Sequence, residues 1–211
     1  MTDSTLLSRI DHLVYAVPDL QAGMDRVEAL LGVRPVPGGR HPHYRTHNAI
    51  LSLGDTTYLE VIAPDPSAAI PDRGMPLGLQ DLTAERLATW AVRTERIMAD
   101  AAAAASSGVG QVEAGSRQRA DGTLLTWKLT DPYAMPFDGA LPFLISWGDT
   151  PHPAASAPCA GTLASLHIEH PEAERVRDAL TPLDLGVEVR HADAVRLVAT
   201  IRTDQGTVVL T

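Results

Sequence analysis

One succession of elements, a strand, a helix and then two or three strands, recurs three times along the chain. In its first occurrence, residues 10–17 are mostly β-branched and apolar, as in a strand, and residues 20–31 carry apolar side chains at helical spacing. A turn-rich stretch follows at 35–39, and the pattern then predicts strands at 47–53 and 57–63.

The second and third occurrences repeat this order. The second is predicted to contain a strand near 89–92, a helix over 95–105 and strands at 111–118, 124–129 and 142–147. The third is predicted to contain a strand at 163–169, a helix over 173–180 and strands at 187–190, 196–203 and 207–210. The units begin near residues 12, 89 and 165, which is a spacing of about 76 residues and indicates internal duplication. We therefore expect an α+β fold with one domain over 8–158 (units at 8–63 and 84–148) and a third related unit over 159–211.

The composition excludes several classes of protein. Hydrophobic residues make up 45% and charged residues 20% of the 211 residues, which excludes a disordered or fibrous chain. The net charge of −9 argues against a nucleic-acid partner and a polybasic membrane anchor. Since no run of about 18 apolar residues occurs and the first residues lack a signal-peptide core, we expect a cytoplasmic protein. The single Cys159 excludes an intramolecular disulfide. A nucleophilic cysteine needs a base held beside it, and the sequence near Cys159 offers none.

Four segments carry a resemblance to a known family. They are IDHLVYAVPDL at 10–20, GVRPVPGGRHPHYRTHNAILSLG at 32–54, YLEVIAPDP at 58–66 and LPFLISWGDTPHPAASAP at 141–158. With these segments the chain resembles the glyoxalase-like domain proteins of the vicinal oxygen chelate superfamily. The resemblance implies that two βαβββ units pair into a curved, mostly antiparallel sheet whose concave face, the cup, holds a small-molecule ligand and often a divalent metal.

The resemblance also implies which positions face a metal, namely one on the first and one on the last strand of each unit. The first unit supplies His12 and Glu60 at these positions, and the second supplies Thr89 and Ile145. Ile145 cannot bind a metal, so half of the usual ligand set is missing.

His12 and Glu60 therefore admit two interpretations. They either form a buried His–Glu pair without a metal, because a buried carboxylate needs a partner, or they are ligands of a divalent metal such as Fe, Mn, Zn or Ni. In the second case His47 is the best third ligand, since it lies on a strand and not in a loop. A solvated loop is the alternative for His41 and His43, and we favour it for His43. Asn48 faces away from His47 on the same strand, so only one of the two can point into the cup.

Two arginines and an aromatic side chain are candidates for binding a substrate. Arg117 and Arg119 lie two residues apart on a predicted strand, so both side chains can grip one carboxylate or phosphate. The alternative is a charged strand end in water. Trp147 is expected in the apolar wall of the cup, and Asn48 is the fourth candidate contact.

Two functions remain open on this basis. The first is an enzyme of the lyase, isomerase or dioxygenase type, acting on a small polar metabolite such as an α-oxo acid, a hydroxy acid or an aromatic diol, with His12 and Glu60 as its catalytic pair. The second is a non-catalytic binding or sequestering protein of the same fold. The third unit has an apolar sheet face that must be covered, within the chain or across a two-fold axis, and we expect a homodimer. The residues of this face are Val195, Leu197, Val208 and Leu210.

Overall fold

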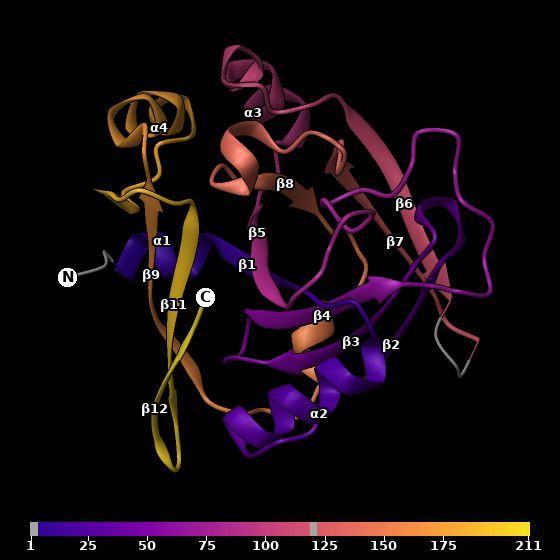
Figure 1. The fold of residues 1–211 in the computed structure, drawn as a ribbon. Helices are drawn as coiled ribbons and strands as arrows, with labels where there is room; N and C mark the ends of the chain where they lie inside the picture. The colour runs from indigo at the N-terminus through magenta and orange to yellow at the C-terminus, as the bar shows by residue number, and fades with distance from the viewer. Residues whose placement is uncertain (1–3, 119–121) are drawn as a thin grey trace.

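The structure, a computed structural model, describes residues 4–118 and 122–211. Its strands form an eight-stranded sheet in the order β2-β3-β4-β1-β5-β8-β7-β6 and a four-stranded sheet in the order β10-β9-β11-β12. The few helices lie on the outside of these sheets (Figure 1). The predicted α+β fold with a curved, mostly antiparallel sheet is confirmed.

The first unit has the predicted order and contains one strand more than the sequence pattern defined. It consists of β1 (Ile10–Ala16), α2 (Leu20–Leu31), β2 (Val36–His41), β3 (Thr46–Ser52) and β4 (Tyr58–Pro64). The turn-rich stretch at 35–39 forms most of β2. Pro37 is tolerated there because β2 is the edge of the sheet, where a residue without an N–H does not interrupt a ladder on both sides.

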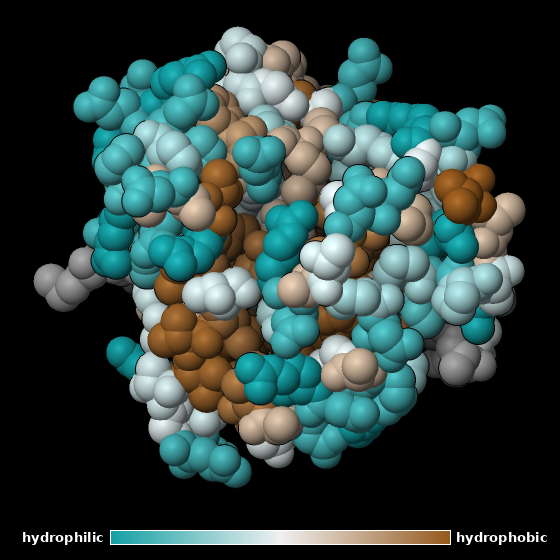
Figure 2. Space-filling model, viewed as in Figure 1, coloured by the Kyte–Doolittle hydropathy of each residue, from teal (hydrophilic) through white to brown (hydrophobic). Residues whose placement is uncertain are grey.

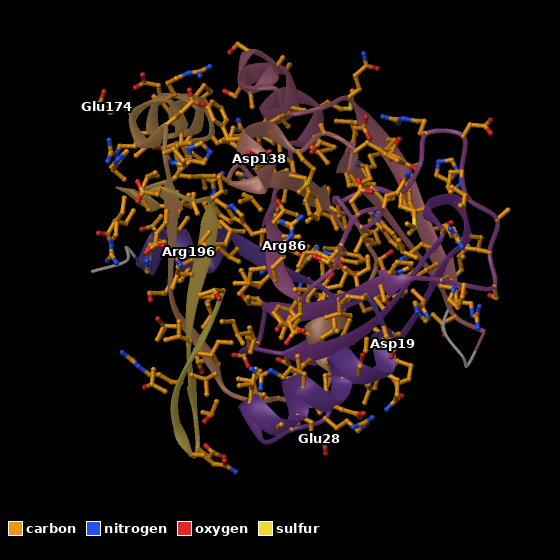
Figure 3. All side chains as sticks on the ribbon, viewed as in Figure 1. Asp19, Glu28, Arg86, Asp138, Glu174 and Arg196 are labelled. Carbon is orange, nitrogen blue, oxygen red and sulfur yellow. The ribbon has the colours of Figure 1, made fainter. Side chains whose placement is uncertain are left out.

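Helix α2 begins and ends at strong local signals. The Asp19 carboxylate accepts the backbone N–H of Ala22 at 2.8 Å and so caps the first turn. Gly32 takes the left-handed conformation with φ 76° and donates its N–H to the Glu28 carbonyl. Asp19 is labelled at the start of this helix and Glu28 along it in Figure 3. Between them, Val27 is fully buried against the outer face of the sheet.

The second unit mirrors the first. It consists of β5 (Arg86–Arg93), α3 (Ile97–Ala103), β6 (Val112–Gln118), β7 (Leu124–Thr130) and β8 (Phe143–Ser146). In each unit the first strand pairs in parallel with the last, and the two first strands, β1 and β5, pair antiparallel at the centre. The two outer strands β2 and β6 also approach each other, so the sheet curves until its edges nearly meet.

The third unit has the predicted succession of elements but a different strand order. It consists of β9 (Thr162–His170), α4 (Ala173–Leu180), β10 (Glu188–His191), β11 (Arg196–Thr203) and β12 (Gly206–Leu210). Its first strand, β9, lies between β10 and β11, whereas β1 and β5 pair with the last strand of their own units. The expected kinship with the first two units is therefore limited to the succession along the chain, and the domain boundary near residue 158 stays a prediction.

The apolar face of the third unit is covered within the chain. A single core cluster joins Leu166, Leu197 and Ile201 of the C-terminal sheet to Trp90 and Val92 of the large sheet. Figure 2 shows apolar surface along this boundary, between the C-terminal sheet at the left and the rest of the molecule. The third unit therefore does not need a second copy to cover this face, which was our reason for expecting a homodimer.

A short helix, α1 (Ser4–Arg9), precedes β1 and contacts β9, and the sequence pattern does not predict it. Among the described residues, no helix combines the length and the apolar character that crossing a membrane requires.

Because one core joins both sheets, we expect the chain to unfold in a single cooperative transition. Leu166 is 0% exposed, so Leu166→Ala should lower the free energy of unfolding by about 2–5 kcal/mol. The control Leu124→Ala removes the same atoms from a side chain that is 61% exposed and should cost less than about 1 kcal/mol. Denaturant unfolding followed by fluorescence and circular dichroism measures both. Two separate transitions would contradict the shared core.

Candidate functional site

The concave face of the large sheet encloses a cavity of about 60 Å³. Polar side chains of the first unit and Arg117 line it together with apolar and aromatic side chains, which come mostly from the second unit. Pro76 and Leu77 of the loop between β4 and β5 also line it, and the Leu77 backbone N–H donates to the Pro132 carbonyl at 3.3 Å. The polar lining includes His12, His41, Asn48, Tyr58, Glu60 and Arg117, and the wall includes Trp127, Leu129, Phe143, Ile145 and Trp147.

His12 and Glu60 meet in this cavity. His12 Nε2 lies 3.7 Å from Glu60 Oε2, within the distance expected for an interacting pair, and both residues are buried. The His12 ring stacks on Tyr58 with 4.6 Å between the ring centroids. Burial, and then the charges of Glu60 and Asp11, raise the pKa of Tyr58 well above its usual range, so its hydroxyl keeps its proton.

A bulge in β1 determines which way His12 faces. Ile10 pairs with Val92 and His12 with Ala91, so β1 carries one residue more than β5 at Asp11. Strict alternation places Ile10 on the same face as His12, and this expectation is wrong. Ile10 belongs to the core on the outer face, whereas His12 lines the cup.

Asp11 is the site residue that the sequence pattern did not reveal. It is 0% exposed and accepts three N–H donors: His12 Nδ1 at 2.8 Å, His152 Nε2 at 3.1 Å and Trp147 Nε1 at 3.1 Å. The Arg93 guanidinium adds a positive charge, with its Nε 3.9 Å from Asp11 Oδ2. Alternation assigns Asp11 to the face opposite His12, and only the bulge brings the two neighbouring side chains together. A carboxylate before a candidate histidine in a strand was the one available signal.

The donors around Asp11 determine the tautomers of two histidines. His152 Nδ1 accepts the backbone N–H of Ala154, so the proton of a neutral ring lies on Nε2 and is donated to Asp11. His12 likewise donates from Nδ1 and turns Nε2 toward Glu60. Burial by itself raises the pKa of Asp11, but hydrogen bonds from His12 and His152, with their charges, lower it well below its usual range. Asp11 is therefore an ionised anchor for His12.

Asn48 connects Glu60 to a buried arginine. Its amide Nδ2 donates to Glu60 Oε1, and its Oδ1 accepts from Arg117 Nη1 at 2.9 Å. Arg117 is 4% exposed and comes from the edge strand β6, while Asn48 comes from β3 on the other side of the cup. Arg117 therefore lies inside the cup. Arg119 lies outside the described residues.

The neighbouring histidines fall in three different places. His47 does not line the cavity, because Asn48 takes the inward position on β3 and alternation turns His47 outward. His41 is the last residue of β2; it lines the cavity and bonds Thr46 at 3.0 Å. His43 is exposed, as we favoured. Of the predicted metal triad, His12 and Glu60 line the cavity and His47 does not, and the triad itself stays a prediction.

The side chains around His12 and Glu60 do not form a divalent-metal site. The second unit places Phe143 and Ile145 in the cavity, and the Thr89 hydroxyl donates to the backbone carbonyl of Leu141. The described residues contain no group of three or more His, Cys, Asp or Glu side chains with the arrangement of a metal site. The Arg117 guanidinium is connected to Glu60 through Asn48, and its positive charge disfavours a metal cation beside Glu60.

We expect Asp11→Asn to release the His12 ring. A carboxamide has one oxygen and cannot accept all three buried N–H donors, so unfolding free energy should fall by about 1–3 kcal/mol and His12 should lose its single tautomer. Long-range proton–nitrogen NMR of labelled histidine reports the tautomer directly. Asp149→Asn, on an exposed loop, is the matched control. A wild-type His12 protonated on Nε2 alone would contradict the arrangement.

His41 should make stability depend on pH. Burial, together with Arg117 and His47 and against Glu60, lowers its pKa from 6.5 to about 4. Between these values the unfolded state binds a proton that the folded state does not, so stability falls as the pH drops, by about 1.4 kcal/mol per pH unit for this group. In denaturant unfolding between about pH 4 and 6.5, His41→Gln should remove this part of the pH dependence of the unfolding free energy, whereas the control His43→Gln should keep it. Equal slopes in both variants would show that His41 is protonated in the folded state.

Solved structures of other proteins superpose on this chain. Among solved structures, a hypothetical protein from Staphylococcus aureus superposes with a TM-score of 0.67 at 12% identity, over 92% of this chain and 91% of that one. Methylmalonyl-CoA epimerase from Mycobacterium tuberculosis gives a TM-score of 0.44 at 19% identity, over 74% of this chain and 97% of that one. A variant of the methylmalonyl-CoA epimerase from Streptomyces coelicolor, in complex with 2-nitronate-propionyl-CoA, gives a TM-score of 0.45 at 22% identity, over 69% of this chain and 98% of that one.

No curated protein matches this sequence significantly. The sequence profile of the glyoxalase-like domain matches residues 10–183, which include both units of the cup and the first strand and helix of the third unit. The chain belongs to the glyoxalase-like domain family.

Proposed function

We propose that this protein is an enzyme that moves a proton on a small polar metabolite held in the cup, without a resident metal. One observation carries the proposal. An imidazole whose Nδ1 is anchored by the buried Asp11 presents its Nε2 to Glu60 inside a cavity with an apolar wall. Two groups that exchange protons, fixed in such a cavity, are the usual equipment for acid–base catalysis.

The proposed chemistry needs no further reactant. Glu60 Oε2 removes a proton from a carbon next to a carbonyl group, and the C–H electron pair moves to the carbonyl oxygen to give an enolate. The proton then returns to carbon, directly from Glu60 or, after it has passed from Glu60 to His12 Nε2, from that nitrogen. Asp11 holds the ring in place throughout and balances its charge whenever Nε2 also carries a proton. The net result is isomerisation, epimerisation or exchange at that carbon.

The alternative is a binding protein that performs no chemistry. The same cavity would then hold its ligand through Asn48, Trp147 and Arg117. His12 and Glu60 would serve only as polar partners of each other. The anchoring of His12 by Asp11 favours the enzyme, because a ligand contact alone does not require one imidazole tautomer.

Hydrogen exchange with solvent tests the proposal. The protein is incubated in D₂O with a panel of small 2-oxo and 2-hydroxy acids, and proton NMR follows loss of the signals from the carbon next to the carbonyl or carboxyl group. We expect exchange with at least one compound, and a loss of about 100-fold or more in Glu60→Gln. Glu85→Gln, at an exposed carboxylate, is the control. Binding without exchange would support the sequestering protein instead.

The homodimer also stays a proposal. The apolar face of the third unit no longer supports it, because the core of the chain covers that face. However, β12 is an edge strand with Val209 55% exposed, and an apolar edge strand can pair with a second copy.

A further inference from the structure

We infer that Arg117 binds the carboxylate of the substrate, so that the substrate class is a small carboxylic acid whose reactive carbon lies beside that carboxylate or one atom further along. The assignment of the reactive carbon rests on the proposed function, and the assignment of the anion rests on Arg117 itself. It separates the acids from the neutral aromatic diols that the sequence left open.

Arg117 is a buried cation without an acidic partner among the described residues. It is 4% exposed, and no carboxylate of that part of the chain lies within 4.0 Å of its nitrogens. Within the same residues its hydrogen bond goes to a neutral amide oxygen, at Asn48. Burying a charge costs several kcal/mol unless a counter-charge and hydrogen bonds compensate it. Since the guanidinium lines the cavity, an anion bound there would supply both.

The guanidinium group favours a carboxylate among the possible anions of small size. Its N–H groups form a planar fork that matches the two oxygens of a carboxylate, with two parallel hydrogen bonds. The cavity of about 60 Å³ leaves room for only a few non-hydrogen atoms, far below the space that a drug-sized ligand occupies. Phe143 and Ile145 give part of the lining an apolar surface suited to a short carbon chain.

Asn48 keeps this cation available. A direct ion pair between Arg117 and Glu60 would neutralise both groups, and the amide prevents it by accepting from the arginine and donating to the glutamate. The positive group and the proposed base are thereby held at two ends of one chain of hydrogen bonds. A substrate carboxylate at Arg117 brings the neighbouring carbon toward Glu60, and the positive charge stabilises the enolate that forms.

A purely structural role is the competing explanation. Arg117 reaches across from β6 to β3, and a Cβ built on Gly38 of β2 would lie 2.3 Å from both Arg117 Nη1 and Asn48 Oδ1. The chain thus leaves room for this contact, which could serve simply to close the cup. The two roles differ in their effect on ligand affinity, because a structural contact affects stability without distinguishing an acid from its amide.

Calorimetric titration separates them. Pyruvate, lactate, glyoxylate and acetate are titrated into the wild-type protein at up to millimolar concentrations, beside the neutral amides of pyruvate and lactate. We expect at least one acid to bind and its amide to bind about 10- to 100-fold more weakly. Arg117→Met should lose the same factor for the acid, and Arg117→Lys should recover part of it because it keeps the charge without the fork. Glu60→Gln should still bind the acid.

Three results would overturn the inference: equal affinity for acid and amide, no binding of any acid, or unchanged affinity in folded Arg117→Met. The acid–amide comparison uses only the wild-type protein, so it decides even if Arg117→Met fails to fold. Failure of the proposed function appears differently, as binding of the acid that depends on Arg117 without any exchange in D₂O. Exchange that Arg117→Met leaves unchanged would keep the enzyme and remove the role of Arg117.

Discussion

The buried carboxylate of Asp11 is the interaction on which the rest of the site depends. It has no contact with solvent, and it accepts N–H donors from its own strand, from Trp147 after β8 and from His152 in the loop that leads to the third unit. An ionised group at this depth is stable only because these donors surround it. In return it fixes the His12 ring, the wall of the cup and the course of that loop relative to β1.

The curvature of the large sheet makes a second connection possible. Arg117 and Asn48 lie 69 residues apart, on strands near the two opposite edges of the sheet, and they meet only because those edges approach each other. Through Asn48 the second unit contributes a cation from β6, whereas the two positions at which the family resemblance places its metal ligands hold Thr89 and Ile145. The cup thus combines a proton-exchanging pair from the first unit with a positive charge from the second.

The third unit supports this cup from behind. Its sheet packs on the outer face of β5 through a shared core, and the linker before it supplies His152 to Asp11. It adds no side chain to the described lining of the cavity. The unit therefore acts on the site through the position of the linker and the rigidity of the central strands.

The sequence by itself determined the elements and the central pair. Apolar periodicity located α2 and α4 and most strands, and the resemblance to the family singled out His12 and Glu60, which lie on the neighbouring parallel strands β1 and β4. Only the tertiary structure decided the rest. The bulge that turns Asp11 toward His12 is one extra residue in the pairing of β1 with β5, which no local pattern encodes. The burial of Arg117, the outward position of His47 and the strand order of the third unit depend on how distant strands pair, and pairing energies become visible only when the strands are in contact.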